Sequence, residues 1–222
     1  MENKYFNIDG NAITGLTEEG MKLKDIIIPL EINGIEIKSI RYSSFEKNQK
    51  LRSIVIPDSV EYIWPYAFTG CKNLKSVIIG DNVEILFESV FAGCKSLKYI
   101  ELPQSIQSIG ADVFYQCELL KEIEIPVTVK SIDIRAFSGC RNLKSIKIPN
   151  IDKIKYSTFL KCTSLTEITI PKSVKVIEEF AFMYCSKLKT VYYEGNVNEW
   201  NSMIITKGNN NLFNAKIKFN CN

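Results

Sequence analysis

Residues 54–76 read IVIPDSVEYIWPYAFTGCKNLKS, and versions of this 23-residue unit follow one another along most of the chain. The repeat is clearest in two columns of residues that recur once per unit. The columns are Cys71, Cys94, Cys117, Cys140, Cys162 and Cys185, and Phe68, Phe91, Phe114, Phe137, Phe159 and Phe182. A fixed period of this length indicates a stacked repeat architecture, because one unit is too short to bury its own apolar face.

Each unit predicts one short β-strand with a single buried face, because apolar residues alternate before a proline. Proline lacks an N–H and therefore ends the hydrogen-bonded ladder. A second short inward-facing segment is expected on the opposite side of the unit, as at Val83 and Leu86. We therefore expect a right-handed, mainly β solenoid with parallel strands, and with helix only near residues 197–204. The predicted strands are 53–56, 76–79, 99–102, 122–125, 145–148, 167–170 and 190–193.

The two ends of the chain depart from the unit and predict caps. Residues 1–25 contain a β-hairpin pattern, 26–193 form an array of about seven rungs, and 194–222 form a C-terminal cap with a closing strand over 215–219. In the cap, Asn196 and Glu199 have the spacing of a helix start. The first rung is degenerate and carries an insert with Asn33-Gly34 between isoleucines, which predicts a hairpin.

The composition argues against several classes of function. The chain contains no histidine, so it cannot form a Ser-His-Asp or Cys-His pair or an imidazole zinc site. Its net charge of +3 arises from 28 basic and 25 acidic residues, which is too balanced for a nucleic-acid-binding protein. No apolar run is long enough to span a membrane, and the first residues lack the apolar core of a signal peptide. We expect no catalytic activity, cofactor or metal, and no membrane insertion.

The cysteine column indicates buried thiols. A zinc site needs four sulfurs converging on one point, whereas these cysteines form a line with one member per rung. Parallel side chains also suit disulfide geometry poorly. We therefore interpret the column as small apolar side chains with weak donors, and expect Cys221, which lies outside it, to be the exposed thiol.

The unit resembles the BspA-like leucine-rich repeats of bacterial and protist surface proteins. The resemblance is carried by Ile123-Glu124-Ile125-Pro126, Ile132 and Ala136-Phe137-Ser138-Gly139-Cys140, and it covers residues 26–193. The chain end, from Tyr193-Glu194-Gly195 to Asn214-Ala215, is similar to the tail that closes such arrays. The resemblance implies a secreted or cell-surface protein that binds partners in adhesion, without catalytic residues.

The outward-facing strand positions form one broad face, which is our first candidate recognition surface. Open faces of solenoids commonly bind partners. The candidate residues are Val55, Ile78, Tyr99, Glu101, Glu122, Glu124, Lys147, Thr169 and Tyr192.

A cluster of apolar residues in outward-facing positions forms a second candidate patch, for self-association or another contact. Clustered exposed aromatic residues often mark interaction sites. The alternative is that the insert with Asn33-Gly34 folds over them. The cluster comprises Tyr62, Trp64, Tyr66, Ile85 and Phe87.

The residue after the leucine of each unit is basic in six of the seven units, which predicts a basic stripe. The stripe comprises Arg52, Lys75, Lys98, Lys121, Lys144 and Lys189, with Thr166 as the exception. It could bind an anionic polymer, but such a stripe is more often a solvated face balanced by nearby acids.

The sequence therefore predicts a non-enzymatic binding scaffold for a protein or glycan partner, acting in cell-surface adhesion or host interaction. A protein-interaction scaffold inside the cell, or the repeat module of a larger regulatory protein, is the alternative. We expect a monomer or a weak dimer.

Overall fold

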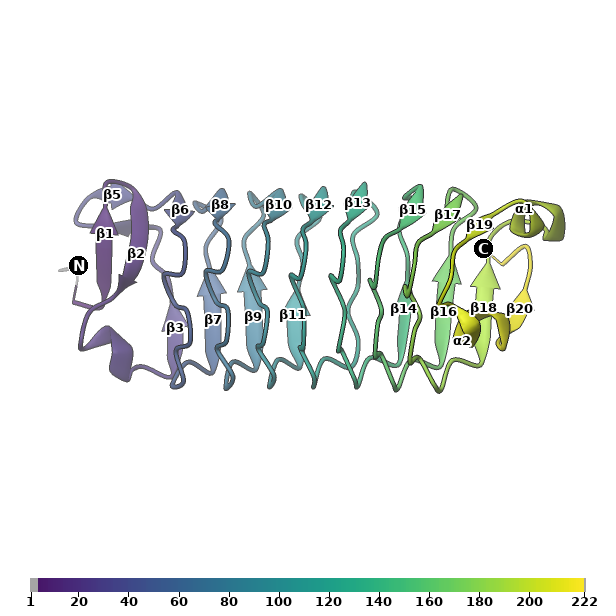
Figure 1. The fold of residues 1–222 in the computed structure, drawn as a ribbon. Helices are drawn as coiled ribbons and strands as arrows, with labels where there is room; N and C mark the ends of the chain where they lie inside the picture. The colour runs from purple at the N-terminus through teal and green to yellow at the C-terminus, as the bar shows by residue number, and fades with distance from the viewer. Residues whose placement is uncertain (1–3, 222) are drawn as a thin grey trace.

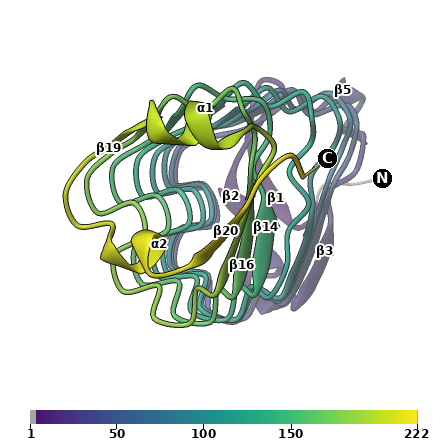
Figure 2. The same cartoon turned by 90° about the vertical axis from the view of Figure 1, so that its right-hand side faces the viewer.

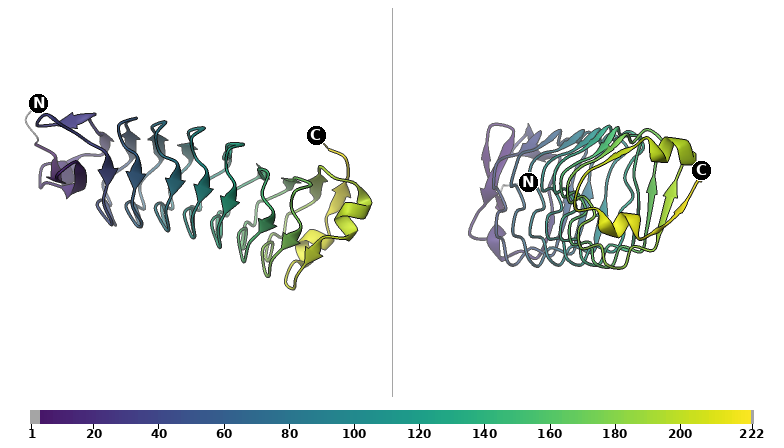
Figure 3. Two further views of the ribbon diagram at one scale, coloured as in Figure 1. Left: turned by 90° about the horizontal axis from the view of Figure 1, so that it is seen from above. Right: turned by 45° about the vertical axis from the view of Figure 1, so that its right-hand side comes forward.

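The computed structural model describes residues 4–221 as a right-handed, mainly β solenoid whose turns lie about 23 residues apart in the sequence. The rungs lie side by side along one axis, with the N-terminus at one end and the C-terminal helices at the other (Figure 1). Views from above and from an oblique angle show the same order of rungs (Figure 3). Both the solenoid and its parallel strands confirm the fold that the repeat predicted.

One side of the solenoid carries the longer strands, in two parallel sheets (Figure 2). The first sheet has the order β11-β9-β7-β3 and the second has the order β14-β16-β18-β20. Apolar side chains alternate inward along these strands, as at Ile54 and Ile56 of β7. The strands are β3 (Asp25–Ile27), β7 (Ser53–Ile56), β9 (Ser76–Ile79), β11 (Tyr99–Glu101), β14 (Ser145–Lys147), β16 (Glu167–Ile170), β18 (Thr190–Tyr193) and β20 (Lys216–Lys218).

The prediction of a strand over 122–125 is wrong. These residues lie between β11 and β14, but they form no strand, and the two sheets end on either side of them. Glu101 and Glu124 occupy the same position in successive rungs, and like charges at facing positions of neighbouring strands destabilise the pairing. The alternation of residues still holds, because Ile123 and Ile125 are buried while Glu122 and Glu124 are exposed.

The opposite side of the solenoid carries the second inward-facing segments as two-residue strands. They are β6 (Ser39–Ile40), β8 (Tyr62–Ile63), β10 (Ile85–Leu86), β12 (Ser108–Ile109), β13 (Ser131–Ile132), β15 (Lys153–Ile154), β17 (Val176–Ile177) and β19 (Ile204–Ile205). This sheet also divides, between β13 and β15. The division coincides with the one unit that is a residue short, at Pro149-Asn150-Ile151.

Two hairpins lie at the N-terminal end. Strands β1 (Phe6–Asp9) and β2 (Ala12–Leu16) pair antiparallel, β2 continues into the solenoid by pairing with β6, and a 3₁₀ turn follows over Gly20–Lys22. The insert forms the predicted hairpin of β4 (Glu31–Ile32) and β5 (Ile35–Glu36). Asn33 and Gly34 have φ values of 53° and 78°, as a two-residue hairpin turn of this type requires.

The C-terminal end is closed by two short helices and the strand β20. Helix α1 (Val197–Asn201) begins with the predicted capping box, in which Asn196 accepts hydrogen bonds from the Asn198 and Glu199 amides. It ends before Ile204, which lies in β19, and α2 (Asn210–Phe213) was not predicted. The predicted closing strand is confirmed by β20, which pairs with β18.

Asn209 connects this cap to the last rung. Its side chain is completely buried; it accepts a hydrogen bond from the Phe182 amide and donates to the Glu178 and Thr206 carbonyls. It thereby satisfies backbone groups that a further rung would otherwise pair.

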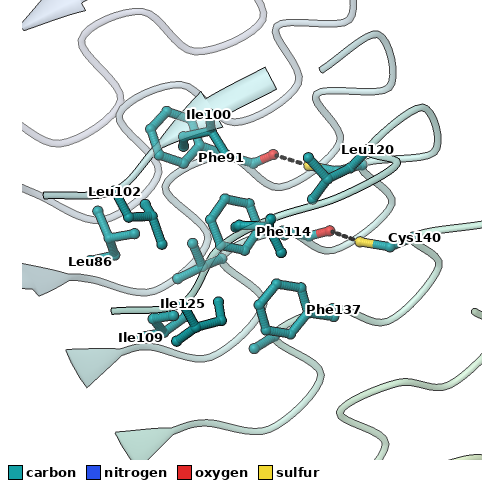
Figure 4. Close-up of a cluster of buried hydrophobic side chains, with 14 of the residues drawn as sticks. Leu86, Phe91, Ile100, Leu102, Ile109, Phe114, Leu120, Ile125, Phe137 and Cys140 are labelled. Carbon is teal, nitrogen blue, oxygen red and sulfur yellow. Dashed lines mark hydrogen bonds between the residues drawn. The ribbon is translucent and has the colours of Figure 1, made fainter. Parts of the chain in front are cut away.

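The core is a continuous column of stacked phenylalanine rings. Neighbouring rings from Phe45 to Phe182 have centroids 4.9 to 6.0 Å apart. Figure 4 shows Phe91, Phe114 and Phe137 in line within this core. All six predicted phenylalanines are fully buried.

The six column cysteines form a ladder beside the rings. Each thiol donates a hydrogen bond to the phenylalanine carbonyl of the preceding rung, as Cys140 does to Phe114 at 3.2 Å (Figure 4). Burial raises the pKa of the Cys71 and Cys185 thiols to about 12, and raises that of the other four as well. The predicted burial of the column is confirmed.

Alkylation of the native protein with iodoacetamide near pH 8 is expected to modify Cys221 alone. The thiolate is the reactive form, and burial both disfavours it and blocks the reagent at the six column cysteines. Mass spectrometry before and after denaturation checks this, with one label expected in the native state and seven in the unfolded chain. Rapid native labelling of several cysteines would show that the column is accessible.

Candidate recognition surfaces

A groove of about 750 Å³ crosses the strand face where the two sheets separate. Seven of the nine candidate residues on this face line it, namely Tyr99, Glu101, Glu122, Glu124, Lys147, Thr169 and Tyr192. Val55 and Ile78 lie on the same face but outside the groove, in β7 and β9. The groove extends from β11 across the strand-free rung to β18.

The groove lining is acidic and aromatic. Tyr99, 52% exposed, donates a hydrogen bond of 2.9 Å to Glu101, and this bond to the carboxylate raises the pKa of Tyr99. Glu122 and Glu124 form no ion pair among residues 4–221. Lys147, by contrast, pairs with Glu194 at 3.1 Å, so its charge is compensated. The lining therefore presents net negative charge beside a rigid aromatic side chain.

Sequence reasoning missed two groove residues in the turn after the strand, Gln104 and Val127. Val127 is 81% exposed. The sequence contained a signal for Val127, because the equivalent position after the strand holds polar residues in other rungs, such as Asp58 and Lys172. An exposed valine in a polar column therefore marks a position where the groove departs from the other rungs.

The second patch is an aromatic ridge near the N-terminal end, formed by Tyr42, Tyr62, Trp64, Tyr66, Ile85 and Phe87. Trp64 stacks on Tyr42 at 5.5 Å, on Tyr62 at 5.9 Å and on Phe87 at 5.4 Å between centroids. Tyr42, which is exposed, was missed by the sequence reasoning.

The predicted hairpin of the insert leaves the aromatic ridge uncovered. Tyr62 is 47% exposed, and Tyr66 and Ile85 are also exposed. A smaller hollow of about 470 Å³ adjoins the ridge at Glu61, Tyr62, Asn82, Glu84 and Ile85. Because the rings cover one another's faces, the ridge presents mainly ring edges to a partner.

The basic stripe lies along one edge of the strand face, and all six of its side chains are exposed. The side chains of the stripe are exposed to solvent, as expected, but their positive charge is not compensated by direct ion pairs with nearby acids. None of its six members forms an ion pair with any residue of the described chain. Its positive charge is therefore open to a ligand.

Comparisons with known proteins bear on what such surfaces are for. The BspA type leucine-rich repeat region matches in six copies over residues 18–122 and 107–222, which is nearly the whole chain. The chain belongs to the BspA-type leucine-rich repeat family. This BspA-type chain is also similar to a leucine-rich repeat protein of T. pallidum, with 26% identity and a TM-score of 0.76 over 85% of this chain and 90% of that one.

A leucine-rich repeat protein of Bacteroides ovatus has the same fold, with 24% identity and a TM-score of 0.72 over 96% of this chain and 69% of that one. The comparison with curated proteins found no match. Family and fold are those of a binding-type repeat scaffold. Among residues 4–221 no group of acids and cysteines is placed to hold a metal ion, and no helix is long and apolar enough to cross a membrane.

Proposed function

We propose that this BspA-type repeat protein is a non-enzymatic scaffold that binds a protein or glycan partner at a cell surface, in adhesion or host interaction. The groove on the strand face is the recognition surface. The single observation that carries the proposal is this groove, which gathers seven exposed or half-exposed candidate residues over five successive rungs.

The stacked core supports this role because it holds the groove residues rigidly. Each outward side chain sits one or two residues from a buried member of the same rung, as Glu122 and Glu124 flank the buried Ile123. A rigid surface loses little conformational entropy when a partner binds. Tyrosines add amphipathic contact area with few rotatable bonds, which interfaces favour.

The charge of the groove indicates the partner's character. Glu101, Glu122 and Glu124 are exposed, and the one lysine of the lining is already paired. A protein partner would therefore present a basic segment with an apolar residue to meet Tyr99 and Val127. Binding through this groove weakens as salt rises, because exposed charges are screened.

The first experiment identifies the partner with the immobilised chain, using a panel of purified host-surface proteins and a glycan array. Two double variants then locate the binding site. Tyr99→Ala with Glu124→Lys alters the groove, and Trp64→Ser with Phe87→Ser alters the aromatic ridge. We expect the groove variant to bind at least about tenfold more weakly, a difference of about 1.4 kcal/mol, and the ridge variant to bind like the unaltered protein.

Tyr184→Ala with Glu18→Lys is the matched control, because it makes the same two changes at exposed positions outside the groove. All variants are compared at unchanged melting temperature. Loss of binding in the ridge variant alone would move the recognition site to the ridge. Dimerisation that depends on concentration and is lost only in that variant would give the ridge a role in self-association.

A further inference from the structure

The basic stripe places a cation at the same position of six of seven successive rungs. Backbone hydrogen bonds align its members in two runs. The Lys75 amide donates to the Arg52 carbonyl at 2.7 Å and the Lys98 amide to the Lys75 carbonyl at 2.9 Å, and beyond the separation of the two sheets the Lys144 amide donates to the Lys121 carbonyl at 3.0 Å. Lys24 belongs to the same row, because its carbonyl accepts a hydrogen bond from the Arg52 amide. The cationic row then comprises Lys24, Arg52, Lys75, Lys98, Lys121, Lys144 and Lys189, with Thr166 between the last two.

No member of the cationic row has an anionic partner within residues 4–221. Elsewhere the same repeat does place opposite charges in register. Lys95 pairs with Glu118 of the next rung at 2.9 Å, and Arg135 holds Asp112 of the preceding rung through two hydrogen bonds. The unpaired row is therefore a local property and not a general consequence of stacking.

The cationic row is electrostatically unfavourable in the free protein. Paired rungs stack about 4.8 Å apart, so Lys24, Arg52, Lys75 and Lys98 place four positive charges along about 14 Å. Like charges at facing positions of neighbouring strands destabilise the pairing. A linear polyanion lying along the row would replace this repulsion with attraction.

We propose that the cationic row binds a linear anionic polysaccharide, whose sulfate or carboxylate groups meet successive cations. The strand position next to the row supports a sugar chain, because it carries hydroxyls and carboxylates that accept or donate hydrogen bonds to sugar hydroxyls. These neighbours are Asp25, Ser53, Ser76, Tyr99, Glu122, Ser145, Glu167 and Thr190.

A nucleic acid fits the cationic row less well. Single-stranded nucleic acids are bound by basic grooves that also supply several aromatic faces for the bases, and Tyr99 is the one aromatic side chain beside the row. The acidic groove next to the row would repel a wide polyanion such as a duplex, whereas a single sugar chain can follow the file of cations. The cations that carry this inference are not candidate residues of the proposed function, although Tyr99 and Glu122 lie both in the groove and beside the row. The inference does not depend on the proposed function.

The test measures binding of the full chain to fluorescently labelled heparin, a sulfated polysaccharide, at low ionic strength. The row variant is Lys75→Gln with Lys98→Gln and Lys121→Gln. Its control is Lys130→Gln with Lys153→Gln and Lys175→Gln, which removes the same charge from exposed lysines on the opposite side of the solenoid. We expect the row variant to bind at least about tenfold more weakly and the control to stay within about twofold of the unaltered protein.

Two further measurements distinguish binding by the row from binding by the groove and from a change in fold stability. The single groove variant Glu124→Lys should bind heparin at least as well as the unaltered protein, because it replaces an acid of the groove with a cation. Without any ligand, the row variant should melt at or above the temperature of the unaltered protein at low salt, and the difference should shrink as salt screens the repulsion.

Several results would overturn the proposal. They are equal heparin binding by the row variant, equal losses in the control, tighter binding of a single-stranded oligonucleotide than of heparin, and a lower melting temperature of the row variant at low salt. A lower melting temperature of the row variant would mean that the cations stabilise the fold and are not kept for binding a ligand.

Discussion

Raising the pH above 9 is expected to lower the free energy of unfolding, with a slope that approaches about 8 kcal/mol per pH unit once the thiols of the unfolded chain are ionised. Burial raises the pKa of six column thiols from their ordinary value of 9.0, to about 12 for Cys71 and Cys185. Each thiol contributes about 1.4 kcal/mol per pH unit between its unfolded and folded pKa values.

The sign follows from which state binds the protons. Above pH 9 the unfolded chain releases its thiol protons while the folded chain keeps them, so the unfolded state binds fewer protons and is favoured. The stabilisation by neutral thiols is fully present below pH 9 and is lost as the pH rises through about 12.

Urea unfolding followed by circular dichroism at pH 8, 9 and 10, under reducing conditions, measures this slope. The double variant Cys117→Ala with Cys140→Ala should reduce the slope by about one third, since two of the six thiols are removed. The slope is the informative quantity, because the variant also lowers the overall stability. An unfolding free energy that stays constant from pH 8 to pH 10 would show that the thiols are not held neutral by burial.

Phe114→Ala is expected to destabilise the protein by about 3–5 kcal/mol, the usual cost of truncating a buried phenylalanine. Phe114 is fully buried, with ring centroids 6.0 Å from Phe91 and 5.3 Å from Phe137. The cavity can relax only partly, because the Phe114 amide donates a hydrogen bond to the Ala136 carbonyl of the next rung at 2.8 Å and the Phe91 amide donates to the Val113 carbonyl at 3.1 Å. The loss of stability in Phe114→Ala should therefore lie in the upper part of the range of about 3–5 kcal/mol.

Equilibrium unfolding in urea measures the loss, and Phe213→Ala is the matched control. Phe213 is exposed in α2, so its truncation should change the stability by less than about 0.5 kcal/mol. A loss below about 1 kcal/mol in Phe114→Ala would mean that the phenylalanine column contributes little to the stability of the stack.

The repeat could be predicted from the sequence because core positions admit few residue types. A buried slot that faces its equivalent in the next rung must hold a side chain of fixed size and polarity, so Phe and Cys recur in register. The hairpin at Asn33-Gly34 and the helix start at Asn196 were readable for a local reason, since each depends on the backbone preferences of a few adjacent residues.

The candidate surfaces could be predicted only in part from the sequence. Strand alternation identified the outward positions, but not that Tyr99 and Tyr192 would line one groove while Val55 would lie outside it. Tyr42 and Val127 were missed because a surface position imposes no residue type, so the period carries no information there.

The amino-acid pattern was enough to specify the rung, the stack and the buried columns, because burial repeats with the period of the chain. Three properties became visible only in the folded stack: the missing strand at 122–125, the groove that opens there, and the lack of anionic partners along the cationic row within residues 4–221. These properties depend on contacts between side chains of neighbouring rungs, which lie about 23 residues apart in the sequence and come within reach only when the rungs stack.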